Sequence, residues 1–381
     1  MAPPTENSFL QEIEKKTLTL RVVNVDVDTL NTEFIRSLPM MPNDQTCNPA
    51  WLSLALQDPS NAELIRTTAL GLQDQGFLAI LSRLAVHLCK RNIDLIKGRV
   101  LVQTSPSAAH NFQETLDHAR IYVSEFEKAG IPKNRYCIKI MATGPGLNAA
   151  KILQDEGIST LGTGVFSVVQ AVACSQASCL YISPYYNANS MPSEIRTHLD
   201  PSLWPDVQDP ALEHPFSHRI AQMVQAYKTL FAATGKEQPL IKNAGVSFRS
   251  YKEVLASSEL GCHSATISQD LLEELKTSTP GKITLPVSPK VASLECPYAD
   301  DVPIPPPRLG ELLTRHLGEQ GGWFANDLTV DLLADGGKVL DQALEKDSEA
   351  ARMVKEALDM FIFCEEETKK LIKGTALVAS L

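Results

Sequence analysis

Residues 136–184, YCIKIMATGPGLNAAKILQDEGISTLGTGVFSVVQAVACSQASCLYISP, alternate short apolar runs with longer segments of helical spacing. The short runs are typical of buried strands, and the longer segments place apolar side chains three and four positions apart. We therefore predict three strands and two helices, in the order 136–141, 144–155, 159–162, 166–174 and 179–183. Strands that alternate with helices in this way predict a parallel sheet.

The same alternation continues on both sides of this stretch. Further strands are predicted at residues 20–28, 44–46, 100–104, 240–244 and 264–267. Further helices are predicted near 29–38, across 50–97, at 108–129 and 217–234, after Ser250 and near 269–277. A loop rich in Pro and Asn is expected at about 184–214. Eight strand-plus-helix units favour a single closed (β/α)8 barrel, the TIM-barrel fold, and an open doubly wound sheet is the alternative.

The chain divides into three parts by composition. Residues 1–280 carry the barrel pattern, and residues 281–310 are rich in proline and are predicted to run as an extended connection. Residues 311–381 form a helical C-terminal extension, with amphipathic spacing from about 330 to 372, that we expect to pack on the barrel. This extension and the helices at 50–97 are the natural surfaces for a homo-oligomer, although the sequence does not define an oligomeric state.

Composition excludes some classes of function. The 381 residues carry a formal net charge of −10, whereas nucleic-acid binders usually present a basic face. No uninterrupted run of about 18 apolar residues predicts a membrane span, and the first residues, MAPPTENSFLQEIEKK, do not resemble a secretory signal. The eight cysteines are scattered without metal-ligand spacing, and we interpret them as reduced thiols of a cytoplasmic protein.

Lys139 is unusual because it lies in the middle of an apolar strand, within YCIKIM at 136–141. Burial disfavours the ammonium form and lowers the pKa of a lysine. A neutral amine can attack a carbonyl to form an imine. The alternatives are a lysine in a salt bridge inside the barrel, or one whose amine reaches solvent at the strand end.

Acidic and amide side chains follow the first two predicted strands. Alternation places Asp26 and Asp28 on the same face of the first strand, with Asp28 nearer the carboxyl end, where barrel enzymes carry their sites. A carboxylate there can move a proton during cleavage of a carbon–carbon bond. The alternative for Asp28 is a cap of the next helix. Asp44 and Asn48, before Pro49, suit a turn-and-cap motif.

Other polar residues are expected on the same rim. Gln103 and Thr104 end the third strand, Thr163 follows the fifth and Tyr185 follows the sixth. The run Ser247-Phe248-Arg249 follows the seventh strand and enters a helix. A serine hydroxyl, an arginine and a helix N-terminus together suit a phosphate group.

Taken in order, these segments resemble the transaldolase family, which includes the fructose-6-phosphate aldolase type. The resemblance covers about residues 20–275. The matching segments are VDT (27–29), DQTCNP (44–49), GRVLVQTS (98–105), AGIPKNRYCIKIMAT (129–143), EGISTLGTGVFSVVQA (156–171), ISPYYN (182–187) and SFRSYKEVLASSELGC (247–262). Seven matches in the same order are far more specific than any one of them alone.

The resemblance implies a role for several residues. It implies a (β/α)8 barrel with Lys139 as the Schiff-base lysine and Asp28 as the strand-one aspartate, with Asp26 as the fallback. The family's asparagine, threonine and serine fall on Asn48, Thr163 and Ser183. The implied substrate is a small carbonyl compound or a sugar, with or without phosphate, and no metal or other cofactor is implied.

Three departures concern the substrate. Transaldolases carry a glutamate at the position of Gln103 and a phenylalanine at the position of Tyr185, whereas the aldolase branch resembles this chain at Gln103, Thr163 and Tyr185. In that branch the three polar groups are thought to hold a water for proton transfer. An arginine that the family places after the sixth strand is here Ala188. These departures favour an aldolase with a small ketone donor. The alternatives are a true transaldolase, which moves a dihydroxyacetone unit between sugar phosphates, and a binding protein without catalysis.

Overall fold

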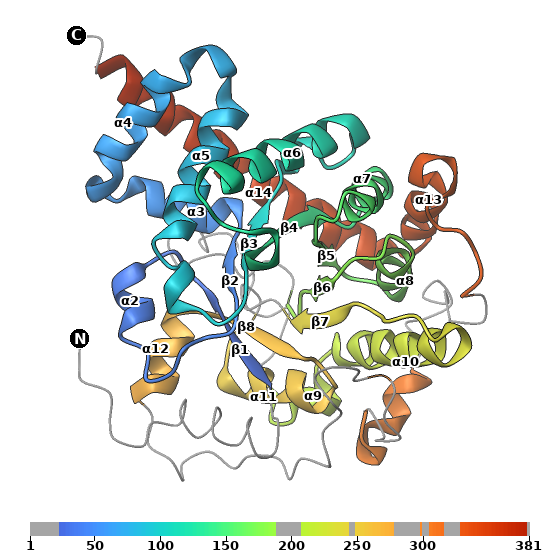
Figure 1. Cartoon of the computed structure of the whole chain (residues 1–381). Coiled ribbons are helices and arrows are strands. Elements are labelled where there is room, and N and C mark those ends of the chain that lie inside the picture. Colours follow the sequence, from blue (N-terminus) through green and yellow to red (C-terminus); the bar gives the residue numbers. More distant parts are fainter. Residues whose placement is uncertain are drawn as a thin grey trace.

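Eight parallel strands close into a barrel in which each strand pairs with the next along the chain and β8 pairs with β1 (Figure 1). The structure is a computed structural model that describes residues 23–187, 207–243, 248–277, 298, 305–315 and 328–378. Helices surround the strands, which confirms the predicted TIM barrel and rules out the open sheet.

The strands agree with the predicted order and differ at their ends by a few residues. They are β1 (Asn24–Asp28), β2 (Gln45–Cys47), β3 (Val100–Gln103), β4 (Tyr136–Met141), β5 (Thr160–Val165), β6 (Tyr181–Pro184), β7 (Leu240–Asn243) and β8 (Ser264–Ser268). The register pairs Gln103 of β3 with Lys139 of β4, and Thr163 of β5 with Ser183 of β6. Neighbouring strands therefore bring polar side chains to similar heights near their carboxyl ends.

The helices of the outer layer also follow the prediction. They are α2 (Thr32–Arg36), α3 (Pro49–Gln57), α4 (Ala62–Gly71), α5 (Phe77–Lys90), α6 (Phe112–Lys128), α7 (Gly144–Asp155), α8 (Val168–Gln176), α9 (Pro210–Glu213), α10 (Ser217–Thr234), α11 (Tyr251–Glu259) and α12 (Gln269–Thr277). Within the described ranges, short 3₁₀ segments accompany them at residues 59–61, 73–75, 93–95, 106–108, 133–135, 307–313 and 334–337. Among the described residues, no helix has the length and apolar character needed to cross a bilayer.

Two predictions need correction. The helix expected at 108–129 begins only at Phe112, because the Asn111 side chain accepts a hydrogen bond from the Glu114 N–H and caps it there. The loop expected at 184–214 contains the short helix α9, which begins at Pro210. The 3₁₀ segment that begins at Pro307 overlaps the end of the predicted extended connection, whose bounds stay a prediction.

The barrel interior is closed below the level of Lys139 by two layers of side chains. A small buried apolar cluster is formed by Leu101, Cys137, Leu161 and Tyr181 from the adjacent strands β3 to β6. Beneath it, the Lys242 amine lies 3.0 Å from Asp26 and 2.9 Å from Asp44, and all three side chains are buried. Burial alone lowers the pKa of Lys242, but the two carboxylates outweigh it and hold that pKa above its ordinary value. These layers leave the carboxyl ends of the strands as the open face.

Replacing Lys242 with methionine is expected to lower the free energy of unfolding by about 3–5 kcal/mol, because two buried carboxylates would lose the cation that lies between them. The shift in the urea midpoint measures this loss. Lys355, on the surface of the C-terminal helix, provides the control: it pairs with Asp359 at 75% side-chain exposure, and Lys355→Met should leave the midpoint unchanged. An unchanged midpoint in Lys242→Met would show that the ion cluster does not stabilise the barrel.

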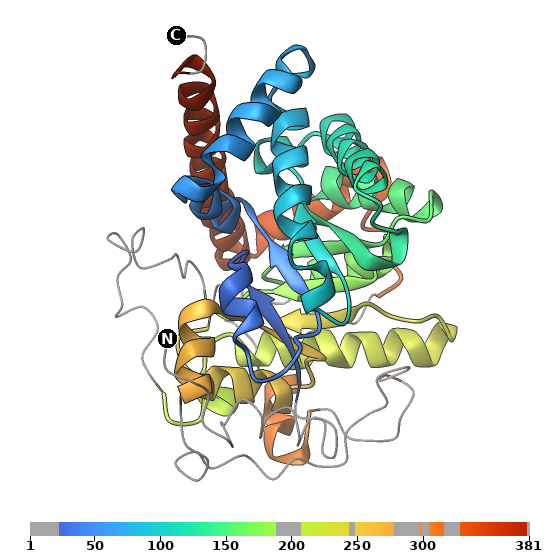
Figure 2. The ribbon, with the colours of Figure 1, turned by 60° about the vertical axis from the view of Figure 1, so that its left-hand side comes forward.

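The C-terminal helices α13 (Lys338–Lys346) and α14 (Ser348–Val378) lie against the outer layer. Figures 1 and 2 show α14, in dark red, beside the blue helices of the N-terminal half, and it contacts α3 and α4. Gly337, just before α13, lies against Gly144 at the start of α7. A Cβ added to Gly144 would lie 2.1 Å from the Gly337 carbonyl oxygen. So close an approach of two backbones requires glycine at both positions. The three-part division of the chain stays a prediction, because most of residues 281–310 lie outside the described parts.

Candidate active site

Lys139 lies on β4 with its side chain inside the barrel, and it is 2% exposed. Its nearest polar contact is the Thr46 hydroxyl on β2, 3.5 Å from the amine nitrogen, and the Tyr185 ring lies 5.9 Å away. Burial lowers the pKa of Lys139 to about 8, while the charge of Asp28 and the Cys47 thiol act in the opposite direction. The amine is therefore neither a solvent-reaching surface group nor a member of an ion pair within 4.0 Å in the described parts.

Asp28 ends β1 and is fully buried. Burial raises the pKa of its carboxyl to about 7, while Lys139 and the Trp51 indole lower it. Neither carboxylate oxygen has a hydrogen bond of normal geometry within the described part of the chain, and the same holds for the Trp51 N–H. The following helix is capped by Asn31 rather than by Asp28, so the capping alternative for Asp28 is wrong. A carboxyl near neutral pKa beside a lysine can exchange protons at neutral pH.

Asp26 has a different environment from Asp28. Its carboxylate lies 3.0 Å from the Lys242 amine and accepts hydrogen bonds from the Asp44 backbone N–H and the Asn43 amide. It belongs to the ion cluster at the closed end of the barrel, with its partners already in place. This arrangement favours Asp28 over Asp26 as the proton shuttle, and that assignment remains a proposal.

Asn48 caps α3, as the turn-and-cap interpretation predicted. Its side-chain oxygen accepts hydrogen bonds from the N–H groups of Ala50 at 3.0 Å and Trp51 at 3.1 Å. The amide nitrogen of the same side chain is buried and has no partner among the described residues. The cap thus fixes the side chain while leaving two N–H donors for another group.

Gln103 ends β3, Thr163 lies on β5, and Ser183 lies on β6, which Tyr185 follows. These strands lie on both sides of β4, and all four side chains are buried. The Thr163 hydroxyl lies 3.0 Å from the Tyr185 hydroxyl. Burial raises the pKa of Tyr185, so the phenol stays protonated at neutral pH. The Gln103 amide nitrogen lies 3.8 Å from the Met141 sulfur, a weak contact. We call these four side chains, which flank Lys139 from β3 on one side and from β5 and β6 on the other, the polar wall.

The predicted phosphate site is described only in part. Ser247 and Ala188 lie outside the described residues. Arg249 has an exposed side chain, and its backbone N–H donates to Glu253 at 2.7 Å. Glu253 also accepts from Asn187, whose oxygen lies 2.9 Å from the His214 ring. This buried set of hydrogen bonds ties the segment after β6 to α11. The role of Ser247 and Arg249 in substrate binding stays a prediction.

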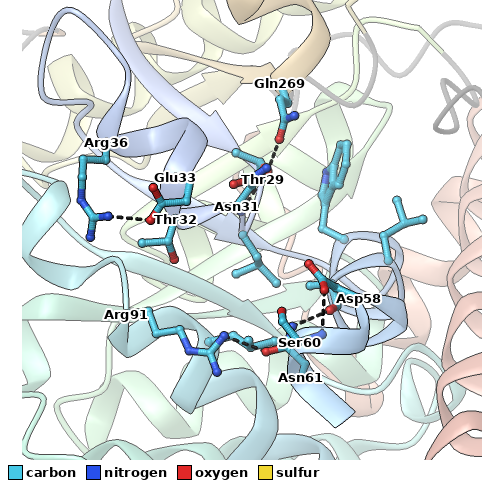
Figure 3. A pocket seen from close by; sticks show the side chains of 15 residues that line it. Thr29, Asn31, Thr32, Glu33, Arg36, Asp58, Ser60, Asn61, Arg91 and Gln269 are labelled. Carbon is cyan, nitrogen blue, oxygen red and sulfur yellow. Dashed lines mark hydrogen bonds and ion pairs between the residues drawn. The ribbon is translucent and has the colours of Figure 1, made fainter. Parts of the chain in front are cut away.

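A pocket of about 650 Å³ lies beside the rim (Figure 3). Thr29 and Gln269, which follow β1 and β8, form part of it and are joined by a hydrogen bond of 3.1 Å. Its charged groups already have partners: Arg36 lies 2.6 Å from Glu33, and Arg91 donates to the Asn61 side chain at 2.7 Å. The pocket borders the segment that follows Asp28, and the side chains of Arg36 and Arg91 are each held by a neighbouring residue.

Sequence reasoning missed three residues near the site. Thr46 contacts Lys139, and its place in the matched segment DQTCNP was a usable signal. Trp51 lies close enough to Asp28 to lower its pKa, and it stands two residues after Pro49. Glu365 lies on α14 and shares a small cavity with Asn48 and Gln103. Nothing in its surrounding sequence, CEEETKK, distinguishes it from the exposed acidic residues beside it.

The fold and the site define a class of protein: a closed parallel barrel with a buried lysine on strand four and a buried carboxylate on strand one. A family model described as Transaldolase/Fructose-6-phosphate aldolase matches residues 25–295, so the chain belongs to this family.

Individual relatives add detail. A protein named transaldolase from Synechocystis sp. is 30% identical over 252 residues, which are 62% of this chain and 59% of that protein. The alignment thus covers less than two thirds of the relative. Among solved structures, an IMP dehydrogenase/GMP reductase-like protein from Corynebacterium glutamicum is 14% identical, over 65% of this chain and 64% of that one, with a TM-score of 0.40. A score this low supports no inference.

Proposed function

We propose that the protein is a Schiff-base enzyme of the class I aldolase type, which makes or breaks a carbon–carbon bond next to an imine on Lys139. The observation that carries the proposal is the buried Lys139 amine, with a pKa lowered to about 8, near a carboxyl with a pKa raised to about 7. An amine with a lowered pKa is a nucleophile near neutral pH. Family membership supports the same chemistry.

The steps follow from the residues that surround the amine. The neutral Lys139 amine adds to a ketone, and loss of water from the carbinolamine gives an iminium. In the cleavage direction Asp28 accepts the proton of the substrate's β-hydroxyl, the carbon–carbon bond breaks and an aldehyde leaves. The bonding electrons pass to the iminium, which becomes an enamine. Protonation of that enamine and hydrolysis release the ketone and regenerate the amine. The N–H groups of Asn48 are available to orient a donor hydroxyl.

The polar wall favours release of a free ketone over its transfer to a second aldehyde. The hydroxyl oxygens of Thr163 and Tyr185 lie 3.0 Å apart. Gln103 lies on β3, where it pairs in register with Lys139 of β4. Three hydroxyl and amide groups of this kind can hold a water that protonates the enamine. The second candidate is transfer of a dihydroxyacetone unit, because the Synechocystis relative is named transaldolase. A small ketone donor without phosphate fits the alanine at position 188.

Reductive trapping tests the proposal. The enzyme is mixed with dihydroxyacetone, hydroxyacetone or fructose 6-phosphate, reduced with borohydride and analysed by intact and peptide mass spectrometry. A reduced adduct on Lys139 is the expected result, and the ketones that react define the donor. Assays for free ketone and for transfer to a second aldehyde then separate the two candidates. A chain that traps none of these ketones would favour a binding protein or a different donor.

The rate of imine formation is expected to rise with pH and to level off above about 8. Below its pKa the lysine is an ammonium ion without a lone pair, so each lower pH unit reduces the reactive fraction by about tenfold. Cyanoborohydride trapping across a pH series measures the midpoint. A midpoint near the ordinary lysine value, about 10.4, would show that burial does not activate the amine.

A further inference from the structure

A small cavity joins the site to the C-terminal helix. It is lined by Asn48 and Gln103 from the barrel rim and by Glu365 and Thr368 from α14. It leaves about 10 Å³ in which the centre of a water molecule can lie, and that is enough for one water. Glu365 is 5% exposed, and one of its carboxylate oxygens accepts a hydrogen bond from Ser107 at 2.6 Å.

Three residues that line this cavity each have a buried polar atom without a partner in the described part of the chain. These atoms are Nδ2 of Asn48, Oε1 of Gln103 and Oε1 of Glu365. The first is a donor and the other two are acceptors. Buried polar groups in native proteins are nearly always satisfied by protein or by ordered water. One water has the hydrogen-bond capacity that these three atoms need, which is to accept one bond from Asn48 and to donate one hydrogen to each of the two oxygens.

We propose that Glu365 is a positioning residue of the active site, which acts through a water bound between Asn48, Gln103 and α14. A carboxylate oxygen that accepts a hydrogen bond from the water fixes the direction in which the water donates. With one hydrogen on Glu365, the other points to Gln103 and holds its amide oxygen toward the cavity. The amide N–H₂ then faces the other way, where its nitrogen lies 3.8 Å from the Met141 sulfur of β4.

This arrangement presents Gln103 to the Lys139 side of the barrel as a hydrogen-bond donor rather than an acceptor. The orientation matters in the steps that follow imine formation, in which Gln103 helps to hold the protonating water. The inference rests on the proposed function for its catalytic consequence, whereas the bound water itself does not depend on that function.

The catalytic test compares Glu365→Met, Glu365→Gln and Ser107→Ala in the full chain. Glu365→Met removes the acceptor and is expected to lower kcat by about tenfold, the cost of a lost buried hydrogen bond, with ketone trapping on Lys139 retained. Glu365→Gln should restore turnover, because an amide oxygen can accept from the same water. Ser107→Ala removes the other contact of Glu365 and should leave kcat unchanged. Thermal unfolding of each variant accompanies the assays.

Two outcomes would overturn the inference. One is Glu365→Met with the kcat of the parent enzyme. The other is Ser107→Ala or Glu365→Gln impaired as much as Glu365→Met, since that pattern shows a role in docking the helix. A crystal structure that resolves ordered water gives a second test, independent of activity: density is expected within hydrogen-bond distance of Asn48, Gln103 and Glu365, and its absence would overturn the inference. A parent enzyme that traps no ketone would instead count against the proposed function.

Discussion

Replacing Lys139 with methionine is expected to abolish covalent trapping of ketones and to reduce turnover by at least about 10⁴-fold. The reason is that Lys139 supplies the reactive amine. The other buried lysine inside the described part of the barrel, Lys242, is held as a cation between Asp26 and Asp44. Methionine keeps the length of the side chain and removes the amine. Intact-mass analysis after reduction, together with a turnover assay, measures both effects.

The stability of this variant separates loss of chemistry from loss of fold. Burial of an amine without an ion-pair partner costs free energy, so an apolar replacement of similar length should leave the unfolding midpoint equal or higher. Loss of activity with a retained midpoint is therefore the expected combination. Turnover that persists in Lys139→Met would exclude the imine mechanism.

Replacing Asp28 with asparagine is expected to lower turnover by about 10²–10⁴-fold, the usual contribution of a general acid–base group. Asparagine has the same shape but cannot accept a proton from the substrate hydroxyl. Trapping on Lys139 should survive, since imine formation needs only the neutral amine. Measuring kcat beside the trapping yield shows whether the two effects separate.

The same variant makes a prediction about pH. The Asp28 charge raises the pKa of Lys139, so its removal should move the midpoint of trapping to lower pH. Asp26→Asn is the matched comparison: Asp26 belongs to the ion cluster, and its loss should affect stability more than the trapping midpoint. A trapping midpoint that is unchanged in Asp28→Asn would show that the two groups do not interact.

The barrel could be predicted because its signals are local and repeated. Residues 136–141 and 144–155 occur as the strand and helix that their apolar spacing predicts. The parallel pairing of β3 with β4 then places Gln103 opposite Lys139. The choice between Asp26 and Asp28 was open in the sequence, because alternation places both on the same face. It depends on Lys242, which lies 216 residues away from Asp26 and pairs with it only in the closed barrel.

The contribution of the C-terminal helix could not be predicted in the same way. Its amphipathic spacing shows that one face is buried but not which surface covers it. Glu365 stands between Cys364 and two further glutamates, so the sequence around it is typical of a solvent-exposed helix face. Only the packing of α14 on the N-terminal helices makes this one carboxylate buried while Glu366 remains 48% exposed.

The contact between Ser107 and Glu365 spans 258 residues. During synthesis the eight strands leave the ribosome long before α14 does, and contacts between distant segments carry the largest cost in chain entropy. The barrel can therefore close around Lys139 while the side of the site next to Asn48 and Gln103 is still open to water. The rim is completed only when α14 docks, so the newly made protein becomes a finished catalyst at the last stage of folding.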